Sequence, residues 1–117
     1  MDKQQIYYGV WDEQEDMLRD FEINESELGG CDILFAYYGY ESYEGEAFVL
    51  YEKDGKLYEV NGSHCSCYGL EDQWDPEVTT WGALLHILEE GSKFFTLDDD
   101  KETLGVLVEL VGKNARK

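Results

Sequence analysis

The side chains with the most reactive chemistry lie together in one short segment, Gly62–Gly69. His64, Cys65 and Cys67 are of the types that bind Zn²⁺, and Cys31 is a candidate fourth ligand for a tetrahedral site. The two cysteines are separated by one residue rather than two, and the chain has no second pair. The set Cys31, His64, Cys65 and Cys67 is therefore kept as an alternative, and the main expectation is that the chain binds no metal or other cofactor.

The same segment suggests a second chemistry, in which Cys65 or Cys67 is a nucleophile activated by His64 or His86. Neighbouring residues on a strand point to opposite faces, so His64 and Cys65 do not pair without a bend. The simpler interpretation is a set of free, half-buried thiols. Three cysteines are an odd number and no apolar leader segment precedes them, which favours a reducing cytoplasm. We therefore do not expect an enzyme.

The charge carries more information than the thiols. The chain has 27 acidic and 9 basic residues and a net charge of −18, and Asp12–Glu27 contains eight acids beside one base, Arg19. Such a field repels nucleic acid and anionic membranes and attracts basic protein surfaces. No basic patch for direct nucleic-acid binding is visible, and no apolar run is long enough to span a membrane. The alternative is that the charge serves only to keep the protein dissolved.

Tyrosines supply a large contact area with few torsions to freeze, and two of them fall in a polar segment, Gly39–Gly45, expected to be a loop. The alternative is that the tyrosines of this region, which include Tyr37 and Tyr38, cover the edge of the core. Together with the first acidic segment they give the expected partner-binding residues: Asp12, Glu13, Glu15, Asp16, Asp20, Glu22, Tyr40 and Tyr43.

The elements that position these residues can be followed along the N-terminal half. Residues 5–10 and 31–38 are apolar and typical of strands, whereas the spacing of Met17, Leu18 and Phe21 predicts a helix over residues 12–21. Residues 47–53 and 56–61 flank Asp54-Gly55, which is the signature of a two-residue β-hairpin. This turn places Tyr51 opposite Tyr58 and Val49 opposite Val60.

The C-terminal half is expected to be mainly helical after an irregular stretch, residues 62–74. Asp75-Pro76 predicts a helix start and Gly91 its end, with one apolar stripe: Val78, Trp81, Leu84, Leu85 and Leu88. Residues 94–97 are a short strand or a packed loop. Asp98–Asp100 is expected to cap a last helix, whose stripe is Leu104, Leu107, Val108 and Val111. The prediction is a single α+β domain over residues 1–117, with an antiparallel sheet packed by about three helices.

Several stretches between Tyr38 and Leu85 carry a family likeness: GEAFVL from Gly45, YEVNGSHCSCYGLE from Tyr58 and QWDPE from Gln73. They resemble small phage and prophage proteins that share the GSHCSCYGLE motif and have no assigned chemistry. The resemblance implies a phage accessory protein acting in the bacterial cytoplasm. By analogy with acidic phage proteins that imitate nucleic acid, the expected partner is a basic host protein: a nuclease, a defence complex or another nucleic-acid-binding protein.

Overall fold

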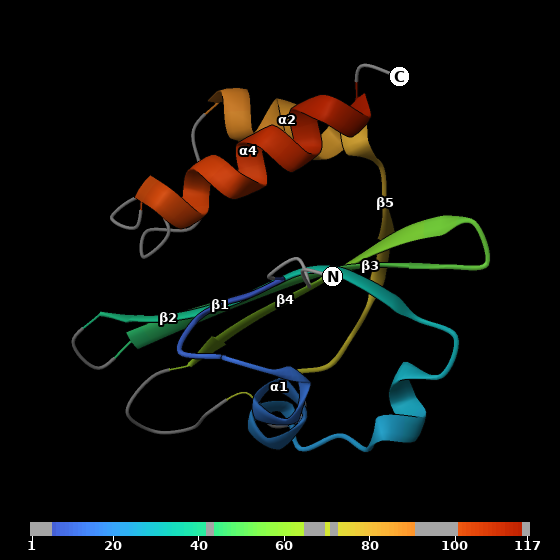
Figure 1. Ribbon diagram of the computed structural model, residues 1–117, viewed down its shortest axis with the longest axis vertical. Coiled ribbons are helices and arrows are strands. Elements are labelled where there is room, and N and C mark those ends of the chain that lie inside the picture. Colours follow the sequence, from blue (N-terminus) through green and yellow to red (C-terminus); the bar gives the residue numbers. More distant parts are fainter. Residues whose placement is uncertain (1–5, 42–43, 65–69, 71–72, 91–100, 116–117) are drawn as a thin grey trace, which may run out of the picture.

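The computed structural model describes residues 6–41, 44–64, 70, 73–90 and 101–115. The strands are β1 (Tyr7–Gly9), β2 (Asp32–Glu41), β3 (Glu44–Lys53), β4 (Lys56–His64) and β5 (Glu77–Thr79). The helices are α1 (Gln14–Phe21), the 3-10 helix η1 (Glu25–Leu28), α2 (Trp81–Glu90) and α4 (Lys101–Ala115). The sheet lies between two helical layers, with α1 and η1 on one face and α2 and α4 on the other (Figure 1). The predicted α+β domain is confirmed.

The strands follow one another across the sheet in sequence order, from β1 to β5. β1 runs parallel to β2, which requires a crossover, and α1 supplies it. The remaining pairs are antiparallel. The radius of gyration of the Cα atoms is 13.8 Å, close to the roughly 13 Å expected of one compact domain of this length.

The hairpin at Asp54-Gly55 forms as predicted. Both residues have positive φ, 53° and 79°, as a type I′ turn requires. The register pairs Tyr51 with Tyr58 and Val49 with Val60. The strands are longer than expected, because β3 begins at Glu44 and β4 continues to His64.

The prediction of a loop over residues 39–45 is wrong. β2 continues to Glu41, and Tyr40 pairs with Gly45 in the ladder between β2 and β3. Tyrosine suits a strand well, and pairing satisfies backbone groups that a loop would have to leave to water. The chain therefore reverses within a short connection, so Tyr40 lies on a strand.

The two faces of the sheet bury separate apolar clusters. On the α1 face the central members are Trp11, Met17, Phe21, Leu28, Ala36, Tyr38, Ala47, Val49, Tyr51, Val60 and Leu70. On the other face they are Phe35, Tyr37, Phe48, Leu50, Leu57, Leu84, Leu107 and Val111. A shift in the pairing of β2 with β3 between Ile33 and Phe35 lets both Leu34 and Phe35 pack on the α2–α4 face.

The prediction that a helix begins at Asp75-Pro76 is also wrong. Residues 77–79 form β5, which pairs with Leu57–Glu59 of β4, and α2 begins at Trp81. The β-branched Val78 and Thr79 favour an edge strand, and proline is tolerated just before one. Thr80 is the residue that caps α2, since its Oγ1 accepts a hydrogen bond from the Ala83 N–H at 3.0 Å.

Other boundaries differ by less. α1 begins at Gln14 rather than Asp12, because Glu13 has the extended backbone of a capping residue, with φ −152°. In α4, Leu107 and Val111 are buried as expected, but Val108 is 45% exposed. Three predictions fall outside the described residues: the helix end at Gly91, the segment 94–97 and the cap at Asp98–Asp100. Within the described part of the chain, every helix is too short or too polar to cross a membrane.

Candidate functional site

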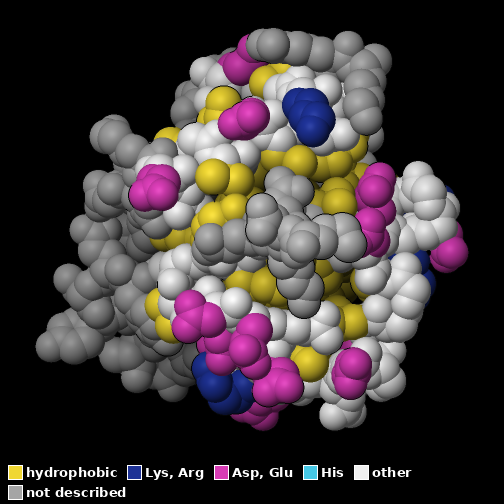
Figure 2. Space-filling model, in the orientation of Figure 1, with side chains coloured by type: hydrophobic (Ala, Val, Ile, Leu, Met, Phe, Trp, Pro, Cys, Tyr) yellow, Lys and Arg dark blue, Asp and Glu magenta, His cyan; other side chains and the backbone are white. Residues whose placement is uncertain are grey.

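The acidic residues from Asp12 to Glu27 form one layer below the sheet, here called the acidic layer. Met17 and Phe21 of α1 and Leu28 of η1 are buried against the sheet and fix this layer in place. Because these three side chains use the inner side of the helices, the carboxylates are left on the outer side. Figure 2 shows acidic side chains gathered at the position of α1, around a basic group.

Two of the predicted binding acids have structural partners. Asp16 Oδ2 accepts hydrogen bonds from the backbone N–H of Asp12 at 2.9 Å and of Glu13 at 3.2 Å. The Asp12 bond lowers the pKa of the Asp16 carboxyl, and the Glu13 bond and Arg19 act in the same direction. Asp20 Oδ2 accepts a hydrogen bond from Trp11 Nε1 at 2.8 Å. These two carboxylates hold the start and the last turn of α1 in place.

Arg19 is the base inside the acidic layer. Its guanidinium lies 3.3 Å from Asp16 Oδ1 and 3.7 Å from Asp20 Oδ1, so its charge offsets the same two carboxylates that already have partners. The other four predicted acids, Asp12, Glu13, Glu15 and Glu22, are exposed, as are Glu25 and Glu27 of η1. These six carboxylates are the solvent-exposed part of the layer.

The predicted tyrosine anchors are positioned differently from the acids. Tyr40 lies near the end of β2, and Tyr43 falls outside the described residues. Tyr37 and Tyr38 are each 2% exposed and belong to the two cores. For this pair the core interpretation is correct.

The structure separates two of the four proposed metal ligands, Cys31 and His64. Cys31 precedes β2 at the hairpin end of the sheet, where its thiol contacts Tyr51. His64 ends β4, six residues beyond Tyr58, the partner of Tyr51. At a strand rise of about 3.3 Å per residue this distance is roughly 20 Å, far too long for one ion. Cys65 and Cys67 lie outside the described residues, and within the described ones no group of three or more His, Cys, Asp or Glu could hold a metal.

The Cys31 thiol is poorly suited to nucleophilic chemistry. Burial raises its pKa, and the nearby Lys53 charge only partly opposes this effect. A raised pKa leaves the thiol protonated at neutral pH, whereas the thiolate is the reactive form. His86, the other histidine considered as a base, is exposed on α2, on the opposite side of the sheet from Cys31. The predicted nucleophiles, Cys65 and Cys67, lie outside the described residues.

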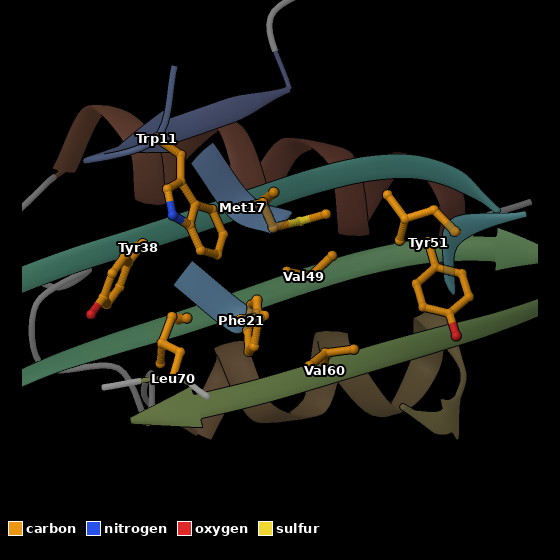
Figure 3. Packing of buried hydrophobic residues seen from close by; sticks show 11 residues of the cluster. Trp11, Met17, Phe21, Tyr38, Val49, Tyr51, Val60 and Leu70 are labelled. Atoms are coloured by element: carbon orange, nitrogen blue, oxygen red, sulfur yellow. The ribbon is translucent and has the colours of Figure 1, made fainter. Parts of the chain in front are cut away.

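A row of apolar side chains crosses the α1 face of the sheet near the hairpin end, here called the aromatic row: Ile33, Tyr51, Tyr58 and Val78, one from each strand from β2 to β5. The Tyr51 ring stacks on Tyr58 at 5.1 Å and on Trp74 at 6.1 Å. Figure 3 shows Tyr51 in the apolar cluster on the α1 face, together with Val60 and Val49. Burial, with the neighbouring Cys31 and Tyr58, raises the pKa of Tyr51 to about 12.

Sequence reasoning found half of this row. The hairpin signature paired Tyr51 with Tyr58, but Val78 was assigned to a helix and Trp74 to an irregular stretch. The signal that could have placed Val78 is the run of β-branched residues Val78-Thr79-Thr80, which favours a strand over the first turn of a helix. No local pattern places Trp74, because its stacking depends on the tertiary fold.

On the opposite face, a pocket of about 260 Å³ opens between the sheet and α4. Tyr8, Leu34 and Phe35 line it from the sheet, and Val106, Leu110, Glu109 and Lys113 line it from α4. Its walls are mainly apolar and its two charged groups have opposite signs. This composition does not select a ligand of one charge.

Comparison with protein-family models, with curated proteins and with solved structures gave no match to the chain.

Proposed function

We propose that the chain is a binding protein whose acidic layer takes the place of a nucleic-acid backbone on a basic host protein. The observation that carries this proposal is the position of six exposed carboxylates, three within α1 and η1 and three directly flanking α1, together on one side of the sheet. Carboxylates fixed on packed helices present their charge without first paying to order a flexible segment. In the proposed setting, the protein is a phage-encoded accessory or inhibitory factor in the bacterial cytoplasm.

The local balance of charge supports a cationic partner. Asp12–Glu27 contains eight acids and Arg19, and Arg19 is occupied by Asp16 and Asp20. Lys53 lies against Gly30, which follows the acidic layer in the chain. A surface of this sign accelerates encounter with Lys- and Arg-rich grooves and repels nucleic acid itself.

The competing explanation is that −18 charges keep the protein dissolved and have no preferred site. Two variants with equal net charge separate the two explanations. The α1 variant carries Asp12→Lys, Glu15→Lys and Glu22→Lys, and the α2–α4 variant carries Glu89→Lys, Glu102→Lys and Glu109→Lys. Each set changes the charge from −18 to −12, and each includes one residue in the first turn of a helix, Glu15 or Glu102.

The test is affinity capture from a bacterial lysate on each immobilised protein, at about 0.1 M and about 1 M salt, between which the Debye length falls from about 10 Å to about 3 Å. We expect the wild type and the α2–α4 variant to retain the same nucleic-acid-binding protein at low salt and to release it at high salt or on addition of duplex DNA. The α1 variant should not retain it. Equal loss in the two variants contradicts the proposal, as does a retained protein that DNA fails to displace.

A further inference from the structure

The pocket of about 260 Å³ between the sheet and α4 lies on the face opposite the acidic layer. Its sheet side is built by a local irregularity of β2. The shift in pairing between Ile33 and Phe35 directs two consecutive side chains, Leu34 and Phe35, to this face, where regular alternation would direct only one. Phe35 is 1% exposed, and its ring stacks on that of Tyr8 from β1 at 5.2 Å. The sheet side of the pocket is therefore apolar and held by packing.

The opposite wall comes from one side of α4. Val106 and Leu110 are four residues apart, face the pocket and are both half-buried. Glu109 and Lys113 are also four residues apart, so they lie one above the other on the helix surface, beside the apolar pair. Both charged residues are exposed, which places them at the opening. The pocket thus has apolar walls and two opposite charges at its opening.

These two charges decide which ligand the opening accepts. Within the described part of the chain, neither Glu109 nor Lys113 takes part in an ion pair. Their Cα atoms are about 6 Å apart along the helix axis, because an α-helix rises about 1.5 Å per residue. A ligand with a single charge would meet one attractive and one repulsive group. A ligand with both an ammonium and a carboxylate can face the opposite charge with each, and it brings no net charge to a chain of −18.

The volume and the walls define the rest of the ligand. Pockets for drug-sized ligands have volumes of roughly 300–1,000 Å³, so a pocket of about 260 Å³ suits a smaller molecule. The walls formed by Leu34, Phe35 and Leu110 require an apolar body, because a polar group placed there would lose its hydrogen bonds to water. A free amino acid with a large apolar side chain combines these properties in one small molecule.

We propose that this pocket binds a free amino acid with a large apolar side chain, such as leucine. The side chain lies between β2 and α4, the α-ammonium faces Glu109, and the α-carboxylate faces Lys113. Because the pocket and the acidic layer lie on opposite faces of the sheet, this inference goes beyond the proposed function and does not depend on it.

The experiment titrates the 117-residue chain with leucine and with three analogues that each lack one feature. Leucinamide lacks the carboxylate, isocaproate lacks the ammonium, and glycine lacks the apolar side chain. Affinities are measured from ¹⁵N chemical shifts, which also locate the bound ligand. The proteins are the wild type, Glu109→Gln, Lys113→Gln and the control Glu102→Gln, which changes an exposed acid of α4 outside the pocket. Thermal unfolding confirms that each variant is folded.

We expect the wild type and Glu102→Gln to bind leucine with a Kd of about 1 mM or lower, and about tenfold more tightly than each analogue. The shifts should centre on the residues that line the pocket. Glu109→Gln should lose most of the preference for leucine over isocaproate, and Lys113→Gln most of the preference for leucine over leucinamide. In each case the variant lacks the partner of the group that the analogue lacks.

The inference is overturned if the wild type shows no saturable binding of leucine, or if leucinamide or isocaproate binds as tightly as leucine. It is also overturned if the shifts fall outside the pocket, or if Glu102→Gln loses as much affinity as the two pocket variants. The α2–α4 variant separates this inference from the proposed function. It carries Glu109→Lys, so it should fail to bind leucine and still retain the nucleic-acid-binding protein.

Discussion

Replacing Phe21 by alanine should release the end of α1 that carries the acidic layer. The Phe21 side chain is 1% exposed, and its ring lies 5.8 Å from the ring of Trp11 and 5.2 Å from that of Trp74. Loss of a buried phenylalanine costs about 3–5 kcal/mol, because a cavity remains beside the transferred surface. The two ring contacts place Phe21 in the upper part of that range, so we expect a loss of about 4 kcal/mol. For a domain of this size the loss lowers Tm by roughly 12–20 °C.

The assay is urea unfolding of the wild type, Phe21→Ala and Glu15→Ala, followed by tryptophan fluorescence and circular dichroism. Glu15 lies on the same helix but is exposed, so its replacement should change the free energy of unfolding by less than about 0.5 kcal/mol. A loss below about 1 kcal/mol for Phe21→Ala would show that α1 is not packed on the sheet as described. The position assigned to the acidic layer would then be wrong.

Four further substitutions test other parts of the structure. Gly9→Ala should weaken the pairing of β1 with β2 and lower the free energy of unfolding, because Gly9 has φ +73° and a Cβ there would lie 2.1 Å from the Tyr38 carbonyl oxygen. Gly105→Ala, in an open position within α4, should raise the free energy of unfolding by about 0.5–1 kcal/mol. Denaturant unfolding curves check both substitutions. Thr80→Ala removes the cap of α2 and should cost about 1 kcal/mol by the same assay. The raised pKa of Tyr51 means that folding favours its neutral form. The stability that this preference contributes is fully present below pH 10 and falls between pH 10 and about 12. Between these two pH values the Tyr51→Phe variant should therefore lose less stability than the wild type.

The parts of the fold that the sequence predicted are those encoded by local chemistry. Asp54-Gly55 both accept positive φ, and that requirement alone fixed the pairing of Tyr51 with Tyr58. The spacing of Met17 and Phe21 likewise fixed the buried side of α1. In both cases the decisive residues lie within a few positions of each other.

The parts that could not be predicted depend on distant partners. Pro76 suits the start of a helix as well as the approach to an edge strand, and only pairing with β4 decides between them. The same limit applies to the acids. Their number was visible in the sequence, but nothing local shows that Asp20 is bound by Trp11 Nε1 or that Asp16 caps the helix. Trp74 meets Tyr51 across more than twenty positions, which leaves no trace in local spacing.

The proposed role depends on where the negative charge lies rather than on its total, because any acidic domain can carry a large total negative charge. The most direct measurement is the association rate constant with the purified partner for the wild type, the α1 variant and the α2–α4 variant, at about 0.1 M salt. We expect the α1 variant to associate at least about tenfold more slowly than the α2–α4 variant, as localised steering requires. Equal rate constants for the two variants, which have the same net charge, would contradict the assignment of the acidic layer as the binding surface.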